Sequence, residues 1–198
     1  MTKASESRKA YPGADDGRRL IDPSCLRRLT DDELDVADEE GDLAGNQHYL
    51  DLRATSLADL SHALDWEAAL IVQVRRSEDP AEAELAVYAS RPPDDERESL
   101  WNMDLGVASA SVALAVAGAC PFTSCNGGTF GGVHDKARPQ VRFYLQDAEL
   151  DVLRDWAEKA GAWIEARDDA LTLVAHDLDV LLGFARTAAR AMESGRQS

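Results

Sequence analysis

The sequence predicts an α+β fold: a two-layer sandwich in which a mostly antiparallel sheet carries its helices on one face. Short alternating apolar runs come in pairs joined by turns, which favours antiparallel ladders. Apolar residues spaced by three and four positions stand between the pairs and predict helices. No GxGxxG motif follows a first strand, so a Rossmann fold is excluded. The expected order is a helix followed by a strand pair, three times over, with a closing helix.

Residues 1–47 are expected to form an acidic arm that is mobile or loosely docked. The stretch DDELDVADEEGD, residues 31–42, places eight carboxylates in twelve positions. Its apolar residues show no clear period beyond Leu34 and Val36, and such a composition is typical of disordered segments. Residues 48–198 are then expected to form a single α+β domain.

The first helix and strand pair are predicted between residues 56 and 90. Leucines at intervals of three and four predict a helix over residues 56–66. The runs ALIVQVR at 69–75 and ELAVYAS at 84–90 are interpreted as strands, because a turn-like SEDPAEA joins them.

The second repeat contains the most regular strand of the sequence. Residues 104–118 are apolar nearly all round and predict a buried helix. A strand starts at 122–125, and QVRFYL at 140–145 alternates apolar with polar residues. Its Val141 side is expected to face the helices, with the arginine and tyrosine on the open face.

The last repeat is predicted from helix-capping residues and from the spacing of apolar residues. Asp147 is expected to cap a helix over 148–160, which a glycine ends. Residues 162–166 and 171–175 predict a hairpin across the turn RDDA. Asp177 is expected to cap the closing helix.

Charge and composition exclude several classes of function. The formal net charge is −16, so DNA is not expected as a partner without a local basic patch. No apolar run reaches the roughly 20 residues that a membrane span needs. The N-terminal residues lack the apolar core of a secretory signal, and an odd count of three cysteines fits a reducing compartment. The protein is therefore expected to be cytoplasmic.

The segment CPFTSCNGGTFGGVH, residues 120–134, predicts a site for a small anionic or nucleotide-like ligand. The loop before residue 140 is long for a hairpin, its glycine amides can serve as anion donors, and basic residues follow them. An Asn-Gly turn and surface ion pairs explain the same residues without a ligand. The candidate ligand-binding residues are Ser124, Asn126, Gly127, Gly128, Gly131, Gly132, Lys136, Arg138 and Arg142.

Cys125 and His134 are candidates for a catalytic nucleophile and its base. A thiol beside an imidazole can attack acyl, phosphoryl or methyl-transfer centres. A buried structural cysteine is the alternative. A zinc site from Cys120, Cys125 and His134 would need a remote fourth ligand such as His176, so no metal is expected.

The run Thr123-Ser124-Cys125-Asn126-Gly127-Gly128 resembles the S-S-C-x-G-R signature of the wybutosine-synthesis tRNA methyltransferase family. The order of elements over residues 105–192 is similar too. The resemblance implies that S-adenosylmethionine is the cofactor and that an RNA is methylated, with Ser124, Cys125 and Gly127 matching. Gly128 departs from the signature, which has arginine there.

An interaction protein without catalytic activity is the alternative from another class. An immunity or defence component could hold a basic protein partner through the acidic arm and surface. Removal of residues 1–45 would abolish that function and spare a site in the loop.

Overall fold

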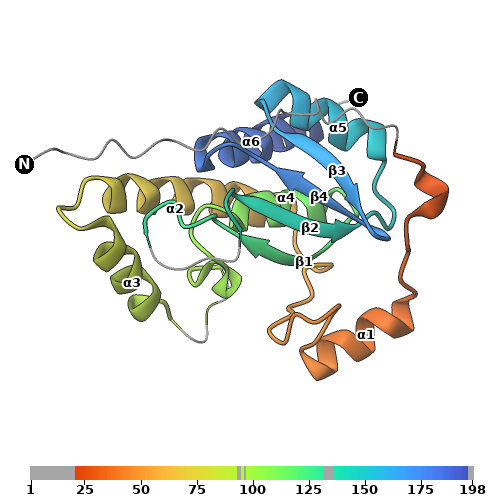
Figure 1. Ribbon diagram of the computed structural model, residues 1–198, viewed down its shortest axis with the longest axis horizontal. Helices are drawn as coiled ribbons and strands as arrows, with labels where there is room; N and C mark the ends of the chain where they lie inside the picture. Colours follow the sequence, from red (N-terminus) through yellow and green to blue (C-terminus); the bar gives the residue numbers. More distant parts are fainter. Residues whose placement is uncertain (1–20, 93–94, 96, 132–135, 196–198) are drawn as a thin grey trace, which may run out of the picture.

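The computed structural model describes residues 21–92, 95, 97–131 and 136–195, and it confirms the α+β class (Figure 1). Its sheet has four strands in the order β1-β2-β4-β3, and each neighbouring pair is antiparallel. The strands are β1 (Cys120–Cys125), β2 (Gln140–Tyr144), β3 (Trp163–Arg167) and β4 (Ala170–Val174). β1 and β3 are therefore the two edges of the sheet.

Six α-helices accompany the sheet in the part of the chain that the structure describes. They are α1 (Asp31–Glu40), α2 (Leu57–Arg75), α3 (Pro80–Ser90), α4 (Ala108–Val116), α5 (Leu150–Ala160) and α6 (Leu178–Gly195). None of these helices is both long and apolar enough to cross a bilayer.

The first predicted strand pair is wrong, because residues 69–75 and 84–90 are helical. The three- and four-residue spacing of the first leucines of α2 continues along the whole helix. One of its positions is Glu67, which is polar and yet buried, so the helical pattern is interrupted in the sequence. α3 starts at a helix signal, with Asp79 as the cap and Pro80 in the first turn. The positions that carry the α2 spacing, all buried, are Leu57, Leu60, Leu64, Glu67, Ile71 and Val74.

The second half of the chain follows the predicted pattern closely. Val141 faces the helices, as expected, and is fully buried in the main core. The β3–β4 hairpin is confirmed. Asp177 caps the closing helix by accepting the Val180 N–H over 3.0 Å. Asp147 does not cap α5, whose first residue is Leu150 after Glu149.

On one face of the sheet, α4 and α5 contact the strands, α6 contacts both of these helices, and α2 packs on α4 and α6, so that all four share the main core (Figure 1). Segments far apart in the chain also cover part of the other face. A second apolar cluster joins four residues of the predicted arm, and Tyr49 just after it, to four residues of the sheet, so the described part of the arm is docked. These residues are Leu29, Leu34, Ala37 and Leu43 from the arm, Tyr49, and Cys120, Phe122, Tyr144 and Ala170 from the sheet.

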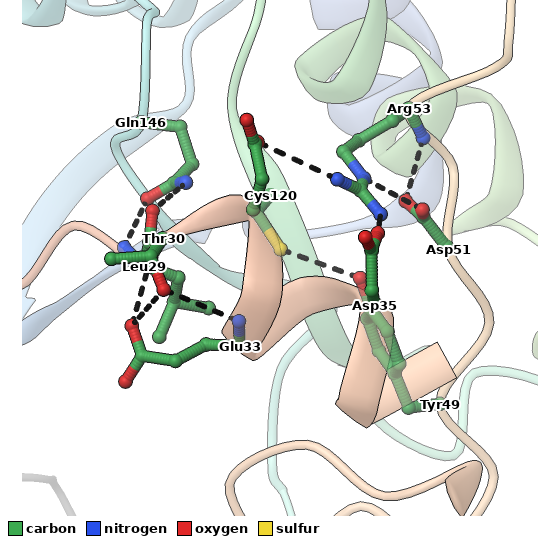
Figure 2. A network of polar contacts seen from close by, with 10 residues as sticks. Leu29, Thr30, Glu33, Asp35, Tyr49, Asp51, Arg53, Cys120 and Gln146 are labelled. Atoms are coloured by element: carbon green, nitrogen blue, oxygen red, sulfur yellow. Dashed lines mark hydrogen bonds and ion pairs between the residues drawn. The ribbon is translucent and has the colours of Figure 1, made fainter. Parts of the chain in front are cut away.

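Polar contacts hold the same segment in place (Figure 2). The Gln146 carboxamide accepts the Leu29 N–H over 2.7 Å and donates to the Leu29 carbonyl over 2.9 Å. The Tyr49 hydroxyl lies 3.6 Å from the Cys120 sulfur. Burial raises the pKa of both Tyr49 and Cys120, so both groups stay protonated near neutral pH.

Arg53 adds ion pairs at the surface of this segment. Its guanidinium lies 2.6 Å from the Asp35 carboxylate and 2.7 Å from that of Asp51. The Asp35 carboxylate raises the pKa of Arg53 above its already high value. Such exposed pairs contribute roughly 0–1 kcal/mol each, so the apolar cluster is the main attachment.

Candidate functional site

The glycine amides of the predicted anion site donate within their own loop. The Gly128 N–H donates to the Asn126 side-chain oxygen over 3.0 Å, and the Gly131 N–H to the Gly128 carbonyl over 3.1 Å. The Gly127 N–H makes a weaker contact of 3.4 Å with the Cys125 sulfur. The arrangement uses these amides internally instead of directing them together at an anion.

Close approach of the chain explains two of these glycines. A Cβ on Gly127, where φ is +69°, would lie 2.6 Å from the Arg138 carbonyl carbon. A Cβ on Gly131, where φ is +121°, would lie 2.9 Å from the Ala81 Cβ on α3. The glycines therefore let the loop fold against its own return and against α3.

Asn126 is a buried hydrogen-bonding centre. It lacks the positive φ that a type I′ turn would require, so the predicted Asn-Gly hairpin turn is wrong. Its side chain is fully buried and donates to Glu84 Oε1 over 2.7 Å and to the Leu105 carbonyl over 3.3 Å. The Tyr88 hydroxyl donates to the same Glu84 oxygen over 2.8 Å and accepts the Leu105 N–H over 3.0 Å. These four residues form a closed ring that ties the loop to α3 and to the start of α4.

The basic candidates do not converge on one point. Arg142 lies over the Phe122 ring of β1 at 5.2 Å, and Arg138 lies over the Trp163 ring of β3 at 5.6 Å. The strand order places those rings on opposite sides of β2. Lys136 is half-buried at the end of the loop. Among the described residues, glycine amides and cations thus form no shared anion pocket.

His134, the proposed base for Cys125, lies outside the described residues, and so does Gly132 of the predicted anion site. Cys125 ends β1 and is half-buried opposite Gln140. It lies five positions along the strand from Cys120, about 17 Å, so the two thiols cannot share a metal ion. In the described ranges no cluster of three or more His, Cys, Asp or Glu side chains could hold a metal.

A cavity of about 640 Å³ lies along the outer edge of β1. Its walls are residues 46 and 48–50, residues 101–104, residue 111 and residues 121–124. The volume lies within the range of sites for small molecules. Ser124 is the candidate from the sequence that lines it, and the other lining residues come from segments that sequence patterns do not connect.

The wall that residues 101–104 form contains an unusual backbone. Leu100, Trp101 and Asn102 have φ values of +54°, +51° and +56°, a left-handed turn made of three non-glycine residues. Each such residue costs about 1–2 kcal/mol relative to right-handed geometry. Strained backbone of this kind clusters at ligand sites and persists where its surroundings hold it in place.

A buried carboxylate holds the chain that follows this wall. Glu67 on α2 is fully buried and accepts N–H groups from Gly106, Ala108 and Ser109 over 2.8, 2.9 and 3.0 Å. The Ser109 hydroxyl donates to it over 2.5 Å. Glu67 thus caps α4 from a neighbouring helix. Burial raises the pKa of Glu67, although these hydrogen bonds act in the opposite direction.

Among the described residues, the lining of the cavity holds aromatic, aliphatic and polar side chains, including His48 but no lysine or arginine. Trp101, Phe122 and Tyr49 contribute rings, and Asp104 contributes a carboxylate whose Oδ2 accepts the Asn126 N–H over 3.3 Å. Behind the wall, Arg91 donates to the Met103 carbonyl over 2.7 Å, and burial lowers the pKa of Arg91. The lining suits a neutral or cationic group better than a phosphate.

Comparison with known proteins finds no matching family model, no matching curated protein and no matching solved structure.

Proposed function

We propose that the protein is a binding domain whose small ligand, without net negative charge, occupies the cavity beside β1. The observation that carries this proposal is the left-handed turn at Leu100–Asn102, which borders a cavity of about 640 Å³. A strained turn of non-glycine residues is retained where binding benefits from its shape. Ser124 belongs to both the cavity and the predicted loop site, so the proposed site adjoins the predicted one.

The charge of the ligand follows from the lining and from the whole chain. Asp104 lies in the wall, and the net charge of −16 repels anions over the surface. An anionic nucleotide would need the guanidinium groups of Arg138 and Arg142, which lie over different rings. A ligand with a planar ring and neutral or positive polar groups fits the lining better.

The test is an NMR titration of the ¹⁵N-labelled protein with neutral, cationic and anionic aromatic fragments. Adenosine, AMP and S-adenosylmethionine are included as probes of the nucleotide-like and methyl-transfer alternatives. We expect shifts at residues 101–104 and 122–124, with anionic fragments at least about tenfold weaker than matched neutral ones. No binding at all contradicts the proposal. AMP shifts confined to residues 127–131 would instead support the loop site.

Two variants separate the cavity from the loop. Ser124→Val fills part of the cavity with a residue that suits a strand, so fragment binding should weaken severalfold. Arg138→Ala removes a predicted loop cation outside the cavity and should leave fragment affinity unchanged. If Arg138→Ala weakened fragment binding and Ser124→Val did not, the result would support the loop site.

Binding of a basic protein partner through α1 is a second candidate. Every carboxylate of α1 is exposed, and the helix is fixed on the sheet by Leu34 and Ala37. A docked acidic helix presents its charges as a defined surface, which favours steering of a basic partner. Binding of a lysine-rich peptide should weaken steeply with salt and on neutralising Asp32, Glu39 and Glu40 together.

A further inference from the structure

The outer edge of β1 carries main-chain groups that no strand pairs with in the described part of the chain. β1 is at the rim of the sheet, and alternate N–H and C=O groups of a rim strand point away from it. One of them, the Phe122 carbonyl, accepts a hydrogen bond from the Asn46 carboxamide over 2.6 Å. Asn46 therefore occupies the position that an amide N–H of an added strand would take.

The same edge forms one side of the cavity. Pro121–Ser124 line it with four consecutive residues, which span about 13 Å of strand. Pro121 has no N–H, and the β1–β2 register shifts between Pro121 and Thr123, so the usable edge begins at Phe122. The cavity thus offers main-chain hydrogen bonds along β1, and Trp101 also lines it.

We propose that the ligand of this cavity is an extended peptide segment that adds as a strand beside β1 and displaces the Asn46 carboxamide from the Phe122 carbonyl. The inference rests on the proposed function, because it names the class of ligand for the same cavity. Main-chain pairing holds such a segment, and apolar side chains at alternate positions can contact Trp101 and Phe122. Asp104 and the net charge of −16 select a segment with lysine or arginine and without acidic residues.

The test begins with selection from a displayed random heptapeptide library on the immobilised wild-type protein, with the bare support used for counter-selection. We expect enriched peptides that are basic, rich in β-branched residues and poor in proline. The best binder is then synthesised with blocked ends and with single N-methyl groups at each amide in turn. Methylation of an amide facing β1 should weaken binding about tenfold, and methylation of the next amide should change it less than twofold.

Charge variants of the peptide and of the protein test whether the cavity prefers a basic segment. Exchanging one lysine of the peptide for glutamate should weaken binding to the wild type, and Asp104→Asn should reduce that difference. Equal affinities across the N-methyl series, or no enriched peptide, overturn the inference. Fragment binding that survives such a result leaves the proposed function standing, whereas loss of both removes the site altogether.

Discussion

The glycine loop and the cavity wall both bend the chain through positive φ, but they do so with different residues. In the loop, Gly127, Gly128 and Gly131 adopt these angles, and hydrogen bonds close the segment upon itself. In the wall, Leu100, Trp101 and Asn102 adopt them, and Trp101 and Asn102 line the cavity.

The positive φ angles therefore have different meanings in the two segments: in the loop they serve the packing of the chain, and in the wall they indicate a candidate ligand site. Glycine accepts positive φ at little steric cost, so a glycine loop needs no further explanation than its close packing. Three consecutive L-residues in that region store several kcal/mol, about 1–2 each, which the rest of the fold must offset. A run of glycines is therefore the weaker indication of a site in this protein, although it is the more conspicuous one in the sequence.

The largest expected effect concerns the buried centre of the loop. Asn126→Ala should lower the free energy of unfolding by about 3 kcal/mol, because Glu84, Leu105 and Gly128 each lose a buried partner. Urea unfolding monitored by circular dichroism measures it. Thr129→Ala, which removes one hydrogen bond at an exposed residue, should cost less than about 1 kcal/mol. Equal losses would mean that the ring is not what fixes the loop.

A pair of glycines tests whether the loop needs close packing as well as positive φ. Gly127→Ala should destabilise by about 2–3 kcal/mol, since its Cβ would meet the backbone of residue 138 at 2.6 Å. Gly45→Ala has a similar φ of +84° and open space around it, so about 1 kcal/mol is expected. Thermal unfolding of both variants gives the comparison. Equal destabilisation of the two variants would mean that the positive φ alone, and not the close packing, accounts for the loss.

Glu67 makes the chain after the cavity wall sensitive to pH. Its pKa is raised on folding by burial, so the folded state binds more protons than the unfolded state above the ordinary glutamate value near 4.3. Stability from this group should therefore fall as pH rises through that window, with a slope of at most about 1.4 kcal/mol per pH unit. Glu67→Gln should remove the slope. An unchanged pH profile in the variant would assign the dependence to other carboxylates.

The smallest expected effect lies in the strained turn. Asn102→Gly should stabilise the fold by about 0.5–1 kcal/mol, because glycine accepts the φ of +56° without strain. The same change should weaken fragment binding, since a more mobile wall must be ordered by the ligand. Paired unfolding and titration measurements test both. Stabilisation with unchanged affinity would show that the turn is architectural, like the loop.

The structure also shows what the sequence could and could not predict. The strand at QVRFYL and the closing helices carry clean periods, and they were predictable. The strand interpretation of ALIVQVR was wrong because a short apolar run fits both states, and Glu67 concealed the helical stripe that continues through it. The Asp79-Pro80 pair is a helix start signal, so α3 could have been predicted from the sequence. The cavity was not, because it joins four separate segments, and the residues Leu-Trp-Asn carry no signal for a left-handed turn.

The burial of Cys120 beneath Tyr49 makes its thiol a natural reporter. A colourless disulfide reagent can modify this sulfur only after Tyr49 and the docked part of the arm have lifted from the sheet. In a chain whose other two cysteines are serine, the modification rate would time that detachment directly. A single absorbance trace could then rank solution conditions by how firmly they keep the arm seated.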